Sequence, residues 1–415
     1  MSEVREKAEL AKRTTGRLGT LSAEAKNAAL VAIADTLIAR TEDILRANRE
    51  DLERGRAGGL SESLLDRLAL TSQRIEAMAQ GLREVVALPD PVGETVAAFD
   101  RPNGLSIRQV RVPIGLIGII YEARPNVTVD AAGLCLKTGN AVLLRGGSSA
   151  LSSNRAVVEA IREALVATDL PPDAVQLVFD ANRASVDEML KLNGLLDCVI
   201  PRGGASLIRT VVENATVPVI ETGAGVCHTY VDDTAAPDMA LAIALNAKVQ
   251  RPSVCNSMET LLVHRRFADD HLAAFAETFR GKGVELRGCG AARALVPWMK
   301  EATDADFATE YNDYILNVRV VDGLDEALAH IARFGTMHSE CIVTETAANA
   351  ERFLNEVDAA AVYHNASTRF TDGFEFGFGA EIGISTQKLH ARGPMGLPAL
   401  TSTKYIVTGS GQVRQ

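Results

Sequence analysis

The sequence predicts an α/β fold with two parallel-sheet units and a smaller antiparallel β element. From residue 113 onward, short runs rich in β-branched residues alternate with stretches of helical periodicity, which is typical of parallel sheets covered by helices on both faces. A second series of strands and helices begins near residue 228. Residues 95–112 contain the turn signal Asn103-Gly104 between two extended segments, which predicts a hairpin.

The first stretch of the chain, residues 2–88, predicts a layer of helices. Ile75, Met78 and Leu82 recur at helical spacing after the polar residue Thr71. Similar polar starts precede the earlier apolar stretches, at Ser22, Thr41 and Ser61. We expect this layer to support the fold without contributing chemistry.

The elements that follow are expected in two groups. In the first group, strands are predicted at 114–120, 141–144, 175–179, 198–200 and 217–220. Between them we expect a helix that ends near Leu136, helices over 152–167 and 204–214, and a short helix after 179. In the second group, helices are predicted over 235–248, 267–280 and 347–355, and strands at 258–263 and 341–344. After Ala360 the chain becomes rich in glycine and serine, which predicts loops that close over a site.

Composition and charge limit the classes of function. The chain has 415 residues, 47% of them hydrophobic and 23% charged, which fits a folded protein of more than one domain. Its formal net charge of -10 argues against a nucleic-acid partner. The charged N-terminal stretch lacks a secretion signal, and no run reaches the roughly 20 apolar residues of a membrane span. We therefore expect a cytoplasmic protein that does not contact a membrane.

The cysteine pattern indicates one candidate nucleophile. The six cysteines are scattered without C-x-x-C or histidine-rich spacing, so we expect no disulfide framework and no metal. Cys255 lies in VQRPSVCNSMETLLVH, after a predicted helix and before an apolar strand, on a loop where a thiolate can meet a substrate. Most cysteines are instead small buried apolar residues, and the other five fit that alternative better. They include Cys227, whose neighbour His228 we interpret as a strand histidine and not as a partner of Cys255.

Three glycine-containing stretches follow predicted strands and could cradle a dinucleotide. They are TGNAVLLRGGSSA with Arg145, Gly146 and Ser148, IPRGGASLIRT with Gly203, Gly204 and Ser206, and IETGAGVCH with Glu221 and Gly223. Glycines let the backbone approach a pyrophosphate, and the first amides of a helix are unpaired donors. The usual G-x-G-x-x-G fingerprint is absent, and tight packing explains a single Gly-Gly equally well. Three such stretches at the strand ends of one sheet favour the dinucleotide interpretation.

Several long sequence segments resemble those of a known protein family, and the resemblance extends from about residue 10 to residue 410. They are YEARPNVTVDAAGLCLKTGNAVLLRGG, IPRGGASLIRTV, QRPSVCNSMETLLV, VYHNASTRFTDG and STQKLHARGPMGLPALTSTKY. With the order of the elements, they resemble the aldehyde dehydrogenase superfamily, which binds NAD(P) without the usual fingerprint. Within that superfamily, the segments are similar to the gamma-glutamyl phosphate reductase family. Matching segments of this length in the same order make chance agreement implausible.

The resemblance implies a fold, a division into domains and an activity. The fold is aldehyde dehydrogenase-like, with two Rossmann-like parallel-sheet domains. Residues 1–94 and 113–227 would bind NADP, and residues 228–360 would carry Cys255. A hairpin arm, active-site loops and an oligomerisation element would come from 95–112 and 361–415.

The implied activity is NADPH-dependent reduction of L-glutamyl 5-phosphate to L-glutamate 5-semialdehyde and phosphate through a Cys255 thioester, the second step of proline biosynthesis from glutamate. Two alternatives stay open. The first is another oxidoreductase of this superfamily, which oxidises an aldehyde or reduces an acyl-CoA. The second is a catalytically silent nucleotide-binding protein.

By the same resemblance, further residues receive roles. The backbone N–H of Cys255 and the amide of Asn126 are candidate oxyanion donors, unless Asn126 only caps the following helix. Arg145 with Ser148, in place of an acid that would bind ribose hydroxyls, favours NADPH over NADH. Glu310, expected before a helix, resembles the glutamate that holds the nicotinamide ribose, with a solvated surface acid as the alternative. Glu221 is a candidate to line the site in a role that the resemblance leaves open, with an ordinary glutamate at a strand end as the alternative.

The substrate and the partners complete the expectation. Arg124 is a candidate to receive the phosphate, and Arg369, beside Ser367 and Thr368, to pair with the α-carboxylate in fork geometry. Structural ion pairs are the alternative for both arginines. The hairpin and a C-terminal strand at 405–408 would exchange across a two-fold axis, so the smallest assembly expected is a homodimer. A glutamate 5-kinase is a candidate partner.

Overall fold

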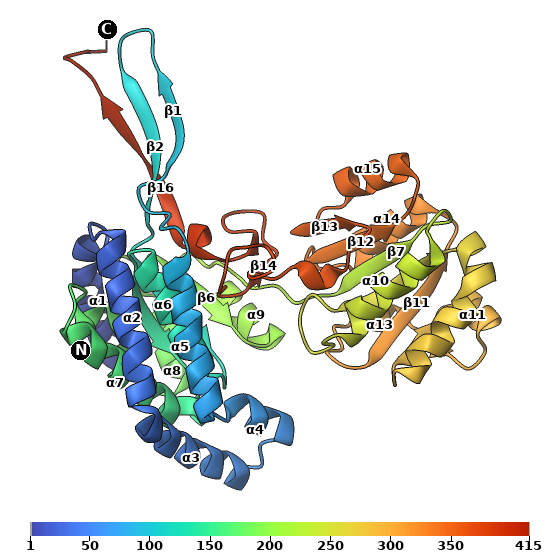
Figure 1. The fold of residues 1–415 in the computed structure, drawn as a ribbon, viewed down its shortest axis with the longest axis horizontal. Coiled ribbons are helices and arrows are strands. Elements are labelled where there is room, and N and C mark those ends of the chain that lie inside the picture. Colours follow the sequence, from blue (N-terminus) through green and yellow to red (C-terminus); the bar gives the residue numbers. More distant parts are fainter. Residues whose placement is uncertain (1, 415) are drawn as a thin grey trace. The chain divides into compact units, whose positions relative to one another are not determined.

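The computed structural model describes residues 2–414, which form two compact units (Figure 1). The first unit comprises the chain up to Thr222, Gly377–Gly383 and the residues from Met395 onward. The second unit comprises Gly223–Phe376 and Ile384–Pro394. The predicted hairpin therefore belongs to the first unit, whereas the assignment of cofactor binding and catalysis to the two units stays a prediction. Within residues 2–414, none of the helices has the length and apolar character that a bilayer span needs.

A four-stranded parallel sheet forms the centre of the first unit, in the order β5-β4-β3-β6. Its strands are β3 (Leu116–Tyr121), β4 (Ala141–Arg145), β5 (Val175–Leu177) and β6 (Cys198–Arg202). The helices that follow them are α6 (Pro125–Lys137), α7 (Leu151–Val166), α8 (Arg183–Met189) and α9 (Ala205–Asn214). β3 and β4 are buried along their whole length, as the unbroken apolar runs of a sheet covered on both faces predict.

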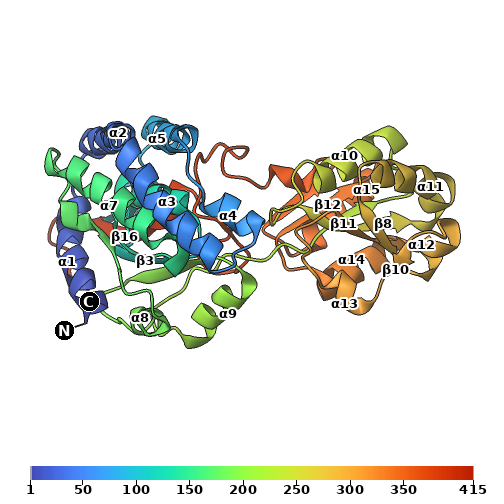
Figure 2. The same ribbon diagram turned by 90° about the horizontal axis from the view of Figure 1, so that it is seen from below.

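The helices that precede this sheet form the expected N-terminal layer. They are α1 (Glu3–Leu18), α2 (Ala23–Ala39), α3 (Thr41–Ala57), α4 (Glu62–Leu68) and α5 (Ser72–Ala87). α1 contacts β3, β4 and α8, while α2 packs against α6 and α7, and α5 packs against α6. α2 and α5 also lie side by side (Figure 2). The side chains of Ser22, Ser61 and Thr71 accept N-cap hydrogen bonds, as expected. For α3, Arg40 holds the N-cap position, so Thr41 is its first helical residue and not its cap.

A three-stranded antiparallel sheet, which we call the arm, extends from the body of the first unit (Figure 1). β1 (Thr95–Asp100) pairs with β2 (Ser106–Pro113), and β2 pairs with β16 (Thr401–Thr408). The hairpin turn is confirmed, and Gly104 has φ +86°, a value that glycine adopts without strain. Every residue of β1 is exposed. The arm therefore joins the hairpin to the C-terminal strand, as predicted.

A seven-stranded parallel sheet forms the centre of the second unit, in the order β10-β9-β11-β8-β7-β12-β13. Its strands are β7 (Cys227–Val231), β8 (Met258–His264), β9 (Glu285–Gly288), β10 (Lys300–Glu301), β11 (Ile315–Val321), β12 (Ser339–Val343) and β13 (Ala361–His364). Its helices are α10 (Pro237–Val249), α11 (Arg265–Gly281), α12 (Gly290–Leu295), α13 (Asp304–Phe307), α14 (Leu324–Phe334) and α15 (Ala347–Glu356). A two-residue pair, β14 (Ile384–Ser385) with β15 (Gly393–Pro394), completes the unit.

Successive residues of the central strands in this sheet enter two different cores. Leu261 and Val263 pack with side chains of α10, α11 and α12, whereas Leu262 between them packs with side chains of α14 and α15. This alternation is the period of two that a strand imposes on its side chains. Since both faces are apolar, helices cover both, and the fold class predicted from the sequence is confirmed.

Several elements differ from the prediction. The strand expected at 217–220 is reduced to a single bridge between Val199 and Val219, because Pro218 has no N–H to donate to a ladder. The strand expected at 175–179 ends at Leu177. The sequence did not predict β9, β11 or α14. Polar side chains in β9 and β11, such as Arg287 and Arg319, interrupt the apolar pattern there.

Candidate active site

Cys255 lies in the turn between α10 and β8, which confirms the position predicted for it between a helix and a strand. The residue is half-buried. Its turn lies at the amino ends of β7 and β8, where Cys227 is the register partner of Met258. The thiol is therefore carried by a connection at the edge of the sheet and not by one of the buried strands.

Two residues, one just before β7 and one at its start, fix the backbone of Cys255. The Sγ of Cys227 donates a hydrogen bond to the carbonyl oxygen of Cys255 at 3.3 Å. Gly225 approaches the same oxygen so closely that a methyl group on its Cα would lie 1.4 Å away. Only glycine fits there, so the stretch IETGAGVCH serves in part to hold the Cys255 turn.

Glu310 joins this arrangement through the backbone of Gly225. Its Oε1 accepts the N–H of Gly225 at 2.9 Å. The structure thus brings Glu310 and Cys255 to the same glycine. Glu310 precedes strand β11 and not the helix that we expected, since the run that follows it, Ile315–Val321, pairs with β8 and β9.

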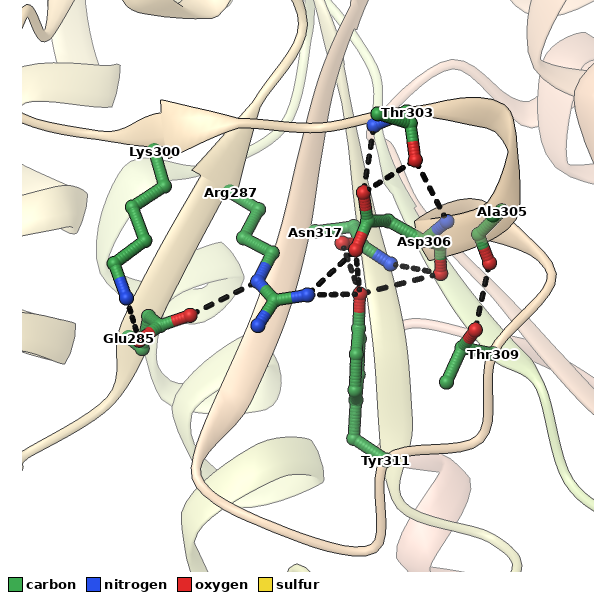
Figure 3. Close-up of polar contacts among 9 residues, drawn as sticks. All are labelled: Glu285, Arg287, Lys300, Thr303, Ala305, Asp306, Thr309, Tyr311 and Asn317. Atoms are coloured by element: carbon green, nitrogen blue, oxygen red, sulfur yellow. Dashed lines mark hydrogen bonds and ion pairs between the residues drawn. The ribbon is translucent and has the colours of Figure 1, made fainter.

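The loop that carries Glu310 is anchored by a polar network that sequence reasoning missed (Figure 3). Asp306 accepts the backbone N–H of Thr303 at 2.8 Å and the hydroxyl of Tyr311 at 3.0 Å. Arg287 also donates to Asp306, at 2.5 Å. These bonds, with the hydroxyl of Thr303 as the largest cause, hold the pKa of the Asp306 carboxyl well below its ordinary value. The network therefore ties Tyr311, the neighbour of Glu310, to the sheet.

The predicted substrate residues lie against the Cys255 turn, through its neighbour Asn256. Thr368 Oγ1 donates to the carbonyl oxygen of Asn256 at 2.7 Å, and the guanidinium of Arg369 donates to the side-chain oxygen of Asn256. Ser367 and Thr368 are buried, and Ser367 Oγ accepts the N–H of Arg369 at 3.3 Å. The two hydroxyls thus hold the loop that carries Arg369.

Arg369 places a positive charge near the thiol. Burial lowers the pKa of its guanidinium, the negative charge of Asp372 and that of Cys255 oppose this shift, and Arg251 adds to it. A cation close to a cysteine favours the thiolate, which is the nucleophilic form. Arg369 is therefore suited to act on Cys255 as well as on an anionic ligand.

Four of the other cysteines fit the buried alternative. Burial raises the pKa of the Cys198 and Cys341 thiols to about 12, and it also raises those of Cys135 and Cys227. Cys289 is half-buried, and its sulfur accepts the N–H of Val320. Thiols with raised pKa values are poor nucleophiles, so the four buried cysteines are weaker candidates than Cys255.

His228 lies in β7, as its interpretation as a strand histidine requires. Its backbone N–H and its Nδ1 both contact Glu340 Oε2, at 2.8 Å and 3.0 Å. Both side chains are buried. His228 is therefore engaged with Glu340 and not with Cys255.

The glycine stretches of the first unit follow the carboxyl ends of β4 and β6, the edge at which parallel sheets bind ligands. The strand order reverses there, since β3 has β4 on one side and β6 on the other. A methyl group at Gly146 would lie 2.2 Å from Asn154 Nδ2, and one at Gly203 would lie 2.7 Å from Glu122 Cδ. Close packing, the alternative left open by the sequence, therefore also favours glycine at both positions, since a methyl group would displace these side chains.

A carboxylate that sequence reasoning missed lies at the N-terminus of α9. Glu122 Oε2 accepts the N–H of Gly204, the N-cap residue, at 3.0 Å, while Ser206 in the first turn is exposed. At α7, Asp51 accepts the N–H of Ser153 at 2.7 Å. The position of Glu122 directly after β3, next to β6, is the signal that could have identified it.

Arg145 is buried at the end of β4, and its guanidinium binds the backbone. It donates to the carbonyl oxygens of Ala181, Asn182 and Gly146 at 2.6, 3.1 and 3.2 Å. Burial lowers the pKa of its guanidinium. These bonds hold the start of α8 against β4. Ser148, three residues further on, is exposed at the start of a 3-10 turn.

Arg124 and Asn126 both lie at the start of α6. Arg124 holds the N-cap position, and Asn126 Nδ2 donates to Asp130 Oδ2 at 3.1 Å. The alternative that Asn126 caps the helix is therefore wrong, because another residue holds that position. Burial raises the pKa of Asp130 to about 6, and the hydrogen bond from Asn126 opposes this shift. The oxyanion role of Asn126 stays a prediction.

Gly223 is the first residue of the second unit. Its N–H donates to the carbonyl oxygen of Ile384 at 2.9 Å, and a methyl group on its Cα would lie 2.2 Å from Thr386 Cγ2. Glu221, two residues earlier, is half-buried at the end of the first unit. Close packing thus accounts for Gly223 in the structure.

A surface pocket of the second unit lies at the carboxyl ends of its strands. Acidic side chains, among them Asp232, Asp322 and Asp325, line it together with Arg352. Asp232 is buried, and Tyr230 donates its hydroxyl to it at 2.7 Å. Since Cys255 lies at the amino ends of the same sheet, the pocket does not include the thiol.

Proteins similar to the chain fall in one family. Residues 1–285 match the model of the aldehyde dehydrogenase family. A gamma-glutamyl phosphate reductase of Moorella thermoacetica is 60% identical over 413 residues, which cover 100% of this chain and 99% of that protein. One of Halalkalibacterium halodurans is 57% identical over 416 residues and 100% of both chains.

Solved structures agree with this similarity. The crystal structure of a gamma-glutamyl phosphate reductase from Thermotoga maritima matches 100% of both chains with a TM-score of 0.98 at 51% identity. A propionaldehyde dehydrogenase from Rhodopseudomonas palustris matches 98% of this chain and 97% of its own with a TM-score of 0.69. At 15% identity, that second likeness shows the fold alone.

Proposed function

Since the chain belongs to the aldehyde dehydrogenase family and, within it, to the gamma-glutamyl phosphate reductases, we propose that it reduces L-glutamyl 5-phosphate to L-glutamate 5-semialdehyde and phosphate. The proposed reductant is NADPH, and the reaction would be the second step of proline biosynthesis from glutamate. The observation that carries the proposal is the half-buried Cys255, in a turn held by Gly225 and placed near the charge of Arg369.

Cys255 is the proposed nucleophile. Its thiolate attacks the carbonyl carbon of the acyl phosphate, the C–S bond forms, the bond from carbon to the phosphate oxygen breaks, and inorganic phosphate leaves. The acyl group then remains on Cys255 as a thioester. Arg369 favours the thiolate before the attack, and the backbone N–H of Cys255 is a candidate donor to the oxyanion that develops on the carbonyl oxygen.

The first unit offers features that fit a nicotinamide dinucleotide. Gly203 and Gly204 bring bare backbone to the start of α9, whose exposed first turn can receive a pyrophosphate. Near Gly146, the buried amide nitrogen of Asn154 has no hydrogen-bond partner among residues 2–414, although the amide oxygen accepts the hydroxyl of Thr128 at 3.0 Å. A buried donor without a partner fits a position beside a ligand site. When bound, NADPH supplies the hydride that converts the thioester into the aldehyde.

The proposed cofactor contacts are those predicted from the sequence, except that Ser148 is favoured over Arg145 for binding the 2′-phosphate. Gly203, Gly204 and Ser206 are proposed to hold the pyrophosphate, and Glu310 the nicotinamide ribose. Because the guanidinium of Arg145 binds three backbone carbonyls, the exposed Ser148 is the better placed candidate for the 2′-phosphate of the adenosine ribose.

The arm is the proposed oligomerisation element. Its outer strands expose apolar side chains, with 47% of Phe99 on β1 and 62% of Tyr405 on β16 accessible. Exposed apolar strands at the edges of a small sheet are suited to pair with another chain. We therefore propose that two copies of the chain associate through the arm.

The reverse reaction tests the proposed function. Purified protein is mixed with L-glutamate 5-semialdehyde, phosphate and NADP+, and NADPH formation is followed by absorbance beside Cys255→Ser and a phosphate-free control. The proposal predicts phosphate-dependent NADPH formation that Cys255→Ser lowers by roughly 1,000-fold or more. Phosphate-independent oxidation would indicate a hydrolytic aldehyde dehydrogenase, and the absence of any turnover would favour the silent alternative.

A further inference from the structure

A buried ion pair closes the base of the turn that carries Cys255. Lys248 lies in the last turn of α10, and Glu259 is the second residue of β8. The Nζ of Lys248 lies 2.7 Å from Glu259 Oε2, and both side chains are fully buried. The pair therefore links the two ends of the connection that holds the thiol.

Glu259 also contacts the loop that carries Glu310. Its Oε1 accepts the backbone N–H of Asn312 at 3.4 Å. Asn312 has φ +56°, in the left-handed region, where a residue other than glycine needs contacts that hold it. Glu310 in turn accepts the N–H of Gly225, whose Cα lies against the carbonyl oxygen of Cys255. One ion pair thus contacts both segments that meet at Gly225.

Two buried charges are a costly way to connect a helix to a strand. Burial raises the pKa of the Glu259 carboxyl and lowers that of the Lys248 ammonium, while the charge of each partner opposes the shift of the other. Glu310 adds to the rise at Glu259, and Asp313 supports the charge on Lys248. Neutral side chains of similar size often stabilise a fold as well as a buried ion pair does. The pair is therefore better explained by the need to position the segments it connects than by the stability it contributes.

We propose that Lys248 and Glu259 are positioning residues for Cys255: their ion pair sets the spacing between the two ends of the Cys255 turn and holds the Glu310 loop against it. Neither side chain touches the reacting atoms in this account. The inference rests on the proposed function for its activity readout only, since the mobility of the two loops can be measured without any substrate.

Two variants separate position from charge. Lys248→Met combined with Glu259→Gln removes both charges and keeps the volumes and an acceptor for Asn312. Glu259→Asp keeps both charges and shortens the acid by one methylene group. The matched control is Asp90→Asn, which breaks the buried Lys26–Asp90 ion pair of the first unit and lies outside the proposed site. All are compared with the wild-type chain by thermal unfolding, kcat and KM in the reverse reaction, and hydrogen exchange of residues 250–257 and 308–313.

The inference predicts at least tenfold lower kcat in both test variants, KM for NADP+ within twofold of wild type, and faster hydrogen exchange in the two loops. Asp90→Asn should lower the unfolding temperature and leave kcat and both loops unchanged. Should the double variant fail to fold, Glu259→Asp decides. A folded test variant with kcat within twofold of wild type and unchanged exchange would overturn the inference, as would an equal loss of kcat in Asp90→Asn. If the wild-type chain shows no phosphate-dependent reaction, the proposed function fails, and hydrogen exchange alone decides the positioning role.

Discussion

The two units carry their candidate residues at opposite ends of their own sheets. In the first unit, Gly146, Gly203 and Glu122 directly follow the carboxyl ends of β4, β6 and β3. In the second unit, Cys255 and Gly225 lie at the amino ends of β8 and β7, and the carboxyl ends hold the acidic pocket instead.

This difference matches the chemistry proposed for each unit. The carboxyl edge of a parallel sheet presents helix N-termini, whose free N–H groups attract phosphates. The amino edge presents helix C-termini, whose partial negative charge opposes a thiolate. Since Cys255 follows the C-terminus of α10, a nearby cation such as Arg369 is suited to offset that charge. In the proposed reaction, a main-chain cradle would thus serve the cofactor, whereas side-chain contacts would serve the nucleophile.

The largest loss of activity is expected on substitution of Gly225 in the second unit. Gly225→Ala places a methyl group 1.4 Å from the carbonyl oxygen of Cys255, so the turn must move. Because a shift of about 1 Å in a reacting group can cost roughly 100-fold in rate, we expect kcat/KM to fall by about that factor or more. The control is Gly281→Ala at the end of α11, where a methyl group meets nothing within 4 Å. Equal activity of the two variants in the reverse reaction would show that the turn does not need this contact.

The second prediction concerns stability at low pH. All seven histidines lie in the second unit, so we expect histidine titration to affect the stability of that unit alone. Burial lowers the pKa of His338 to about 4, whereas an unfolded histidine titrates near ~6.5. The unfolded state therefore binds a proton that the folded state does not, and the stabilisation present above pH 7 is lost as pH falls towards 4. Between pH 7 and pH 5 this amounts to about 2 kcal/mol.

The single tryptophan, Trp298, reports this loss because it also lies in the second unit. Urea unfolding followed by its fluorescence at pH 7 and pH 5 should show the decrease, and His338→Gln should make the decrease smaller by about 2 kcal/mol. An unchanged pH difference in the variant would mean that His338 does not contribute.

The smallest effect is expected at the glycine cradle of the first unit. Gly203→Ala places a methyl group 2.7 Å from the side chain of Glu122 and 2.8 Å from that of Leu207. Both neighbours are side chains that can shift, so we expect NADP+ to bind about tenfold more weakly, or roughly 1.4 kcal/mol. Calorimetric titration measures this, with Gly81→Ala in α5 as the control, where a methyl group has no neighbour within 4 Å. Unchanged affinity would place the pyrophosphate elsewhere.

The candidate site of the first unit consists of local glycine stretches, whereas that of the second unit depends on contacts between distant segments. This difference decides what could be predicted from the sequence. In the first unit, β3, β4 and β6 are largely apolar and glycines directly follow β4 and β6, so the candidate cradle was visible as a pattern in these stretches. The arm was predictable for a similar reason, because the turn signal at Asn103-Gly104 is local. The strand expected at 217–220 failed on Pro218, a local signal that was present and not weighed.

The contacts around Cys255 were not predictable, because their partners are far apart in the chain. Gly225, Glu310 and Thr368 approach the Cys255 turn from three different segments, and no spacing rule connects them. Likewise, Lys248 and Glu259 look like ordinary helix and strand residues until the fold buries them together. The resemblance to a family makes Cys255 the candidate nucleophile, whereas only the structure shows the contacts that hold its turn.

The central claim, a thioester on Cys255, is tested most directly without phosphate. The protein is mixed with L-glutamate 5-semialdehyde and NADP+ alone, NADPH is followed by rapid absorbance, and the quenched protein is digested for mass spectrometry. The account predicts a burst of about one NADPH per active thiol, a glutamyl group on the Cys255 peptide, and steady turnover only after phosphate is added. Continuous NADPH formation without phosphate, or a burst that leaves Cys255 unmodified, would contradict it.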